Sequence, residues 1–192
     1  MFYNLAGLKP ATTKDEFLTR RIRFSHTIFL LMLIRKAKLK DVPELYNFIN
    51  EYAKEGTLLP RSLNSLYENI RDFWVCEKDG EIVGCCALHI VWEDLAEIKS
   101  LAVKKDYKGM GVGSSLVEAC LREAEELGIK KVFVLTYAQG FFSKFNFEEV
   151  EKAKLPHKVW GECINCIKFP SCDEIAMWVD LEKVFIKHDS EV

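Results

Sequence analysis

Near the middle of the chain, glycines recur at every second position between a strand-like run and a helix-like run. Residues 108–113 read Lys-Gly-Met-Gly-Val-Gly, the apolar run 95–103 precedes them, and the amphipathic run 114–127 follows. Glycine lets the backbone approach a ligand closely because no Cβ stands in the way. The N–H groups of a first helical turn and the positive end of the helix dipole attract an anion. The spacing therefore predicts a phosphate-binding loop, with an ordinary glycine-rich turn as the alternative.

Two familiar phosphate loops do not fit this spacing. A Walker A loop ends in Gly-Lys-Ser/Thr, which the segment 108–116 lacks. A Rossmann loop reads Gly-x-Gly-x-x-Gly, whereas the glycines here are spaced Gly-x-Gly-x-Gly. The preceding strand also follows an antiparallel hairpin, which the turn Lys78-Asp79-Gly80 indicates. The pattern favours a phosphate site of another kind.

Three cysteines and a histidine near the C-terminus form a second group that could do chemistry. Cys163, Cys166 and Cys172 follow His157 within a short segment. Thiolate and imidazole are the ligands of structural zinc sites, so a zinc ion bound by these four residues is one hypothesis. The spacing matches no standard zinc finger. Cysteines packed beneath the last strand, or a redox-active dithiol, are alternatives that stay open.

The composition is that of an ordinary globular protein. The chain has 192 residues, 49% hydrophobic and 29% charged, so it can bury a sizeable core. A net charge of -2 does not call for nucleic acid as a partner, and an odd count of seven cysteines does not fit a secreted disulfide framework. The apolar run 28–34 is far shorter than the roughly 20 residues of a membrane span. We therefore expect a cytoplasmic protein without a membrane or nucleic-acid partner.

From residue 32 onward, strand-like and helix-like patterns alternate without repeats. Asp41, followed by Pro43 and Glu44, predicts a helix start, and Ser62 can cap a second helix. Strands are predicted at residues 33–37, 73–77, 81–90, 95–103, 131–136 and 174–180, and helices at 41–55, 62–70, 114–127 and 138–145. We expect one mixed α/β domain over residues 32–183, with a poorly structured extension at 1–31 and a C-terminal tail at 184–192.

The segment 101–116 resembles the pyrophosphate-binding motif Gln/Arg-x-x-Gly-x-Gly/Ala of the GNAT superfamily of acetyl-CoA-dependent N-acetyltransferases. Lys108, Gly111 and Gly113 stand at its defined positions, with lysine in place of Gln/Arg. The resemblance implies a single GNAT domain of α/β class. Its central sheet would be mostly antiparallel, with a splayed parallel strand pair that admits acetyl-CoA. The residues implied to bind acetyl-CoA are Leu101, Ala102 and Val103 at the pantetheine arm, and Lys108, Gly109, Met110, Gly111, Val112, Gly113 and Ser114 at the pyrophosphate.

A narrower resemblance is to short amino-acid N-acetyltransferases related to the N-acetylglutamate synthase of arginine biosynthesis. The segments 58–62, 96–103, 155–160 and 163–176 carry it. It implies transfer of acetyl to the α-amine of a small amino acid, glutamate first, by direct attack of the amine. Another amine, such as a protein N-terminus or a polyamine, stays open, and so does a non-catalytic acyl-CoA-binding regulatory module. A homodimer also remains open.

The acetylation that the resemblance implies assigns roles to three charged residues. The attacking amine must be neutral, so a base is needed, and Glu97 on the strand leading to the glycine loop is the candidate. An amino acid also needs a cation for its α-carboxylate, and the candidates are Arg61 and Lys99. Lys99 projects to the same strand face as Glu97 because strand side chains alternate with period two. A solvated surface charge is the alternative for all three.

The usual acid of the superfamily is missing from the matching position. Many members carry a Tyr-x-x-x-Gly-Phe pattern whose tyrosine protonates the leaving thiolate, whereas this sequence has Phe142 in place of the tyrosine and Asn146 in place of the glycine. Asparagine tolerates a left-handed backbone, so the second change is conservative. Phenylalanine carries no proton to donate. Ser143, Tyr137 or water could substitute, or the thiolate could leave unprotonated.

Overall fold

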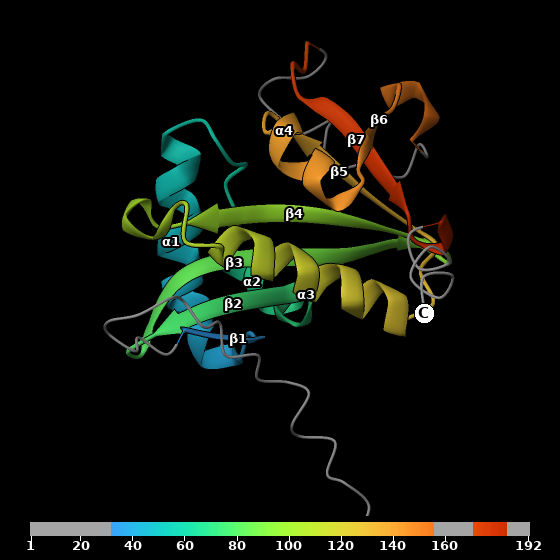
Figure 1. The fold of residues 1–192 in the computed structure, drawn as a ribbon. Helices are drawn as coiled ribbons and strands as arrows, with labels where there is room; N and C mark the ends of the chain where they lie inside the picture. The colour runs from blue at the N-terminus through green and yellow to red at the C-terminus, as the bar shows by residue number, and fades with distance from the viewer. Residues whose placement is uncertain (1–31, 156–170, 184–192) are drawn as a thin grey trace, which may run out of the picture.

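In the computed structural model, one seven-stranded sheet spans the described residues, which are 32–155 and 171–183. The expected extension at 1–31 and tail at 184–192 lie outside them. The strand order is β1-β2-β3-β4-β5-β7-β6 (Figure 1), and every neighbouring pair is antiparallel except β4 with β5. The strands are β1 Met32–Lys36, β2 Phe73–Lys78, β3 Glu81–Trp92, β4 Leu95–Val103, β5 Lys131–Thr136, β6 Glu148–Glu149 and β7 Ile175–Asp180. The predicted α/β class with one parallel pair is confirmed.

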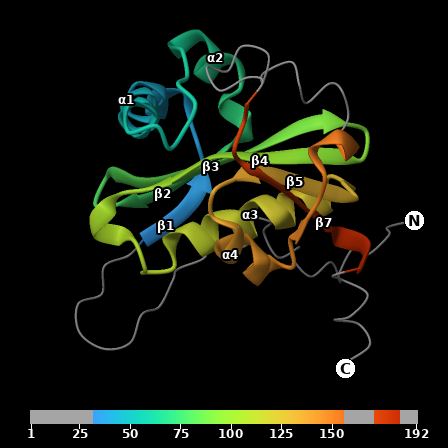
Figure 2. The same cartoon turned by 90° about the horizontal axis from the view of Figure 1, so that it is seen from above.

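Helices cover both faces of the sheet (Figure 2). The α-helices are α1 Val42–Lys54, α2 Leu63–Glu68, α3 Val112–Glu126 and α4 Gln139–Phe142, and the 3-10 turns are Leu39–Asp41, Ile70–Asp72, Lys105–Tyr107, Ser143–Phe145 and Lys152–Lys154. α1 and α2 pack on one face around Leu45 and Ile49, while α3 packs on the other around Leu116 and Val117. None of these helices is long and apolar enough to cross a membrane.

Local patterns predicted most of these elements. The bounds of β4 and β5 agree with the prediction, and Ser62 caps α2 by accepting a hydrogen bond from the Ser65 N–H at 3.1 Å. The expected helix at 138–145 is shorter, because a 3-10 turn replaces its second half. The two-residue strand β6 was missed, since both of its glutamates are exposed and show no apolar alternation.

The parallel pair opens along its length, and this opening positions the site. β4 and β5 are in register only over Leu95–Glu97 and Lys131–Phe133. Beyond these residues β4 and β5 no longer pair with each other. β4 also contains a bulge, where the register with β3 shifts and Ser100 adopts a left-handed φ of 54°. The wedge between the strands leaves room for a ligand in the middle of the sheet.

Candidate active site

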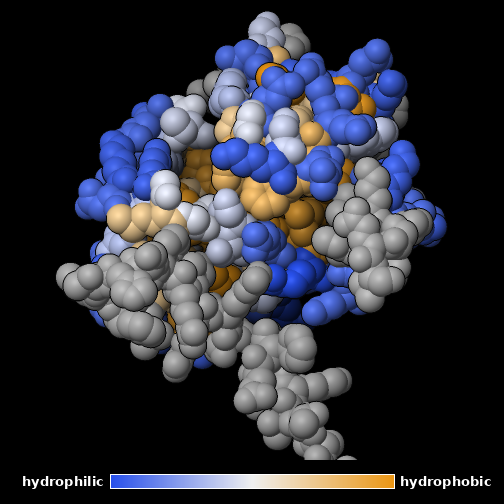
Figure 3. All heavy atoms as spheres, in the orientation of Figure 1, coloured by the Kyte–Doolittle hydropathy of each residue, from blue (hydrophilic) through white to orange (hydrophobic). Residues whose placement is uncertain are grey.

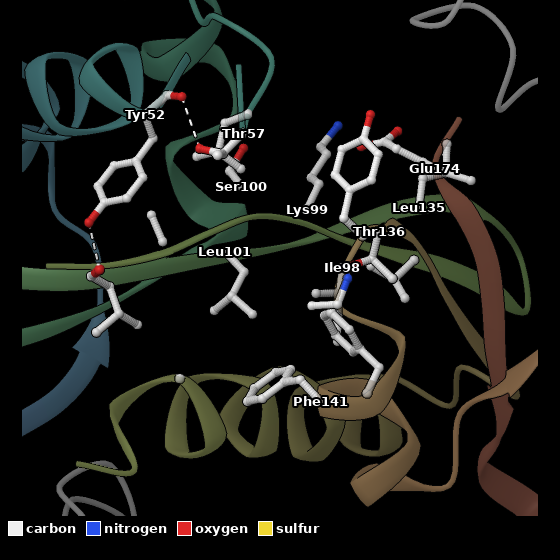
Figure 4. A pocket seen from close by; sticks show the side chains of 18 of the residues that line it. Tyr52, Thr57, Ile98, Lys99, Ser100, Leu101, Leu135, Thr136, Phe141 and Glu174 are labelled. Atoms are coloured by element: carbon white, nitrogen blue, oxygen red, sulfur yellow. Dashed lines mark hydrogen bonds between the residues drawn. The ribbon is translucent and has the colours of Figure 1, made fainter. Parts of the chain in front are cut away.

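A cavity of about 900 Å³ lies where β4 and β5 separate. Its walls come from both strands, from the loop between α1 and α2, from the loop before α3, and from α4 (Figure 4). In the space-filling view, hydrophobic surface lies in a hollow near the middle of the molecule, among hydrophilic side chains (Figure 3). The cavity therefore presents an apolar interior with polar groups around it, as ligand sites usually do.

The glycine loop forms one end of the cavity. Gly111, with a φ of 80°, is the N-cap of α3, so the helix begins at Val112, two residues earlier than predicted. The Ser115 N–H donates to the Gly111 carbonyl at 2.9 Å, so the amides that precede it in the first turn lack a helical acceptor. Lys108 lines the cavity beside them. This end is suited to an anion because backbone donors, the helix dipole and a cation coincide.

Most of the loop residues predicted to bind the pyrophosphate line the cavity. These are Lys108, Gly109, Gly111, Gly113 and Ser114. The side chains of Met110 and Val112 do not line it, because Met110 is exposed and Val112 is buried in the core. The expectation that these two residues bind the pyrophosphate therefore rests on their backbone N–H groups alone.

The edge of β4 that faces the opening is available to a ligand. Leu101, Ala102 and Val103 all line the cavity. The Lys104 N–H donates to the Val83 carbonyl of β3 at 2.9 Å, so strand alternation turns the N–H and C=O of Val103 toward the opening. An extended ligand could pair with this edge as another strand would.

Tyr52 at the end of α1 closes over this edge, and the sequence analysis did not assign it to the site. Its hydroxyl donates to the Val103 carbonyl at 2.6 Å (Figure 4). Burial raises the pKa of Tyr52, and the nearby carboxylate of Glu55 raises it further, so the phenol stays protonated as a donor. Tyr52 falls in the apolar stripe of α1, a pattern that predicts only a core position.

Glu97, Lys99 and Arg61 all line the cavity, away from the glycine loop. Glu97 lies where β4 and β5 still pair, and Lys99 follows on the same strand face. The loop that carries Arg61 is fixed by Asn50 on α1, whose side-chain amide donates to the Arg61 carbonyl at 2.8 Å and accepts from the Arg61 N–H at 3.1 Å. The structure thus brings together the three charged residues that the sequence analysis singled out.

The same end contains polar side chains that sequence reasoning missed. Glu174, just before β7, lies at the same side of the cavity as Lys99 (Figure 4). Lys152 also lines the cavity, and its Nζ donates to the Cys172 carbonyl at 2.7 Å. No local pattern marks these residues, because they reach the cavity only when β7 pairs beside β5.

Three residues near the expected position of the acid differ in whether they can donate a proton into the cavity. Phe142 lines the cavity and is 2% exposed. Ser143 does not line it, and its hydroxyl donates to the Gln139 carbonyl at 3.0 Å. Tyr137 lines the cavity and donates its hydroxyl to Asp173 Oδ1 at 2.5 Å. Of the two hydroxyl-bearing candidates, Tyr137 is therefore better placed than Ser143 to protonate the leaving thiolate.

The zinc hypothesis falls mostly outside the described residues, because His157, Cys163 and Cys166 lie there. Over residues 32–155 and 171–183, no three histidine, cysteine or acidic side chains are arranged to bind a metal ion. The remaining candidate ligand, Cys172, lines the cavity, and its Sγ lies 3.7 Å from Glu174 Oε2. This part of the chain lends the hypothesis no support.

The sequence is similar to that of several acetyltransferases. It is 42% identical to an uncharacterized N-acetyltransferase of Chlorobaculum tepidum over 75% of this chain and 93% of that protein. It is 38% identical to an amino-acid acetyltransferase of Mycobacterium tuberculosis over 68% of this chain and 76% of that protein. An amino-acid acetyltransferase of Pasteurella multocida shows 35% identity over 65% of this chain, which spans only 29% of that longer protein.

Several solved structures superpose on this chain. A Mycobacterium tuberculosis protein in complex with CoA superposes with a TM-score of 0.67 at 31% identity, over 77% of this chain and 98% of the other. N-acetylglutamate synthase from Neisseria gonorrhoeae, complexed with coenzyme A and N-acetyl-glutamate, superposes with a TM-score of 0.70 at 26% identity, over 82% of this chain and 36% of that one. The family model for the acetyltransferase (GNAT) family matches residues 39–147. The chain therefore belongs to the acetyltransferase (GNAT) family.

Proposed function

We propose that this acetyl-CoA-dependent N-acetyltransferase transfers acetyl to the α-amine of an amino acid, with glutamate as the first candidate and arginine biosynthesis as the setting. One observation carries the proposal. A single cavity runs from the glycine loop to a carboxylate, Glu97, that has Lys99 and Arg61 on the same walls. The relatives named amino-acid acetyltransferase, and the structural similarity to N-acetylglutamate synthase, support an amino acid as the acceptor.

The two ends of the cavity are far enough apart for an extended cofactor arm. From Val103 to Glu97, β4 spans about 20 Å at roughly 3.3 Å per residue. The amides at the start of α3 would hold the pyrophosphate, and the edge of β4 that faces the opening would pair with the pantetheine amides. The thioester would then lie near Glu97, where β4 and β5 close on each other.

Glu97 would supply the base that the chemistry needs. An amino acid carries an ammonium group at neutral pH, and Glu97 would take its proton directly or through water. The neutral amine then attacks the thioester carbonyl and a C–N bond forms. The nitrogen gives up a second proton to water, and the C–S bond breaks. The electron pair of that bond leaves with the sulfur. Glu97 returns to the carboxylate by releasing its proton to solvent.

The departing thiolate does not require a strong acid. A thiol has a pKa of about 8.5, so its anion is a far better leaving group than an alkoxide near neutral pH. Phe142 cannot donate a proton, and the Tyr137 hydroxyl already donates to Asp173. We therefore propose that water protonates the thiolate, with Tyr137 as the residue of this chain best placed to assist.

The proposal is tested by measuring release of free thiol from acetyl-CoA across the twenty amino acids, a polyamine and a peptide with a free N-terminus. Turnover fastest with glutamate supports it. Arg61→Gln and Lys99→Gln should then raise the KM for the amino acid about tenfold, since each removes a charge-assisted contact with a carboxylate. Turnover with the polyamine or peptide alone would move the acceptor to another class. Binding of CoA without any turnover would indicate a regulatory module.

A further inference from the structure

One part of the cavity wall is apolar and built from three elements. Ile98 of β4, Val134 of β5 and Phe142 of α4 line the cavity while being only 1%, 4% and 2% exposed. Each of these side chains gives a small part of its surface to the cavity and packs the rest into the core. These three side chains belong to one core cluster on the α3 face of the sheet. Together they form a small apolar recess in the cavity wall.

This recess lies at the closed end of the wedge between β4 and β5. Ile98 directly follows Glu97, and Val134 directly follows Phe133, the last residues that the two strands pair. A ligand that enters from the glycine loop and follows β4 therefore ends at this recess. In the proposed reaction, the group that ends there is the acyl chain of the donor, on the sheet face opposite the Glu97 side chain.

Phe142 is the member of the recess that is positioned most firmly. Its ring makes an edge contact with Phe141 at 5.1 Å and with Phe147 at 5.4 Å between centroids. Phe147 is itself 3% exposed in the same cluster. A ring packed between two others has little freedom to turn aside, because interiors are close-packed and neighbouring side chains cannot give way without strain. Phe142 therefore occupies space that a longer acyl chain would need.

We propose that Phe142 determines the length of the acyl group that the enzyme accepts and restricts it to acetyl. The inference rests on the proposed use of an acyl-CoA donor but not on which amine is the acceptor. It also gives a function to the phenylalanine that stands where related enzymes carry a tyrosine. The aromatic ring is retained for its volume, while the hydroxyl is dispensable.

The test measures binding of acetyl-CoA, propionyl-CoA and butyryl-CoA by calorimetry, so that no acceptor is needed. Phe142→Leu shortens the side chain by an amount comparable with the two extra methylenes of butyryl. Phe73→Leu is the matched control, because Phe73 is similarly buried but belongs to the core cluster on the other face of the sheet and does not line the cavity. Val134→Ala enlarges the same recess from the β5 side. It is the test variant to use if Phe142→Leu does not fold.

In the wild type, butyryl-CoA should bind at least about tenfold more weakly than acetyl-CoA, the scale of forcing methylenes into a packed site. Phe142→Leu or Val134→Ala should narrow this ratio to less than about threefold, while Phe73→Leu should keep it. Equal narrowing in Phe73→Leu, or a wild-type ratio in a folded Phe142→Leu protein, would overturn the inference. Wild-type protein that binds all three donors equally would do so as well. Failure of the proposed acceptor would appear separately, as donor binding without amino-acid turnover.

Discussion

Gly84 on β3 lies directly against Val112, the first residue of α3. A Cβ at position 84 would come 2.9 Å from Val112 Cγ1, 3.1 Å from Leu116 Cδ1 and 3.2 Å from the Ala102 carbonyl. Real Cβ atoms essentially never approach as closely as 2.9 Å, so a side chain at position 84 would force Val112, at the start of the helix that carries the glycine loop, to shift. The depth of the phosphate-binding end of the cavity thus depends on a residue that does not line it.

Gly84→Ala should therefore lower the free energy of unfolding by about 1–3 kcal/mol, the usual cost of overpacking a core. It should also weaken CoA binding, because α3 must shift away from β4. Gly140→Ala is the matched control, since a Cβ there meets nothing within 4 Å. Chemical denaturation gives the stabilities and calorimetry the affinities. Equal stability in the two variants would show that the contact with Val112 relaxes without cost.

Gly111→Asp should remove CoA binding from the glycine loop. The substitution places a carboxylate at the N-cap of α3, where the phosphate oxygens would lie, and the affinity for CoA should fall tenfold or more, on the order of 1.4 kcal/mol. Gly80→Asp controls for backbone strain, because Gly80 has a similar φ of 85° in the turn between β2 and β3. Unchanged CoA affinity in folded Gly111→Asp would place the pyrophosphate elsewhere.

Glu97→Gln should separate catalysis from binding. The substitution keeps the shape of the side chain and removes its basicity, so turnover should fall about 100-fold, within the range of general base catalysis. The affinity for acetyl-CoA should change little, because the loop and the β4 backbone are untouched. Glu126→Gln, at the exposed end of α3, should behave as wild type. Equal rates at neutral pH in wild type and Glu97→Gln would leave Glu97 without a catalytic role.

The ion pair between Arg35 and Asp41 should make stability depend on pH. Arg35 donates to both carboxylate oxygens of Asp41, at 2.6 and 3.0 Å, and the Lys38 N–H adds a third bond at 2.7 Å. Burial acts to raise the pKa of Asp41, but these hydrogen bonds and the positive charge outweigh it, so the pKa lies below its usual value. The carboxylate therefore stabilises the fold above its unfolded-state pKa, and this contribution is lost as the pH falls through the folded value.

Asp41→Asn removes that linkage. The variant should melt below wild type at pH 7, because it leaves Arg35 with Glu77 as its remaining carboxylate partner. As the pH falls below about 4, the usual pKa of an aspartate, the difference in melting temperature should shrink. Melting curves from pH 7 to 3 measure both effects. A difference that stays constant over this range would mean that the pair contributes through packing rather than charge.

The zinc hypothesis makes a separate prediction for protein purified without a histidine tag. If His157, Cys163, Cys166 and Cys172 bind zinc, elemental analysis should find about one equivalent per chain, and a chelator should lower the melting temperature because metal binding contributes to folding. Cys163→Ser and Cys166→Ser should each lose the metal. Cys76→Ser should retain it, since Cys76 is buried on β2, where it pairs with Ile34 of β1. Protein with almost no zinc would leave packing as the explanation for the cysteines.

The sequence by itself determined the features that depend on neighbouring residues. β4 and β5 were predicted at their observed bounds. In β5 an apolar run specifies a buried strand, and in β4 apolar residues recur between turn signals despite Glu97 and Lys99. The glycine loop was recognisable because Gly109 and Gly111 both take a positive φ, which few other residues adopt. Asn146 likewise adopts the expected left-handed backbone, with a φ of 61°.

Only the tertiary structure decided which residues meet across the cavity. Tyr52 contacts a strand 51 positions further along the chain, and its helical spacing predicts no more than a core residue. Lys152 and Glu174 join the site because β7 pairs beside β5, and Phe142 closes the recess because α4 folds under the point where β4 and β5 diverge. Hydrophobic and hydrogen-bonding periodicity act over a few residues and so specify elements. The order and splay of strands depend on packing between distant segments, for which a single sequence carries no local pattern.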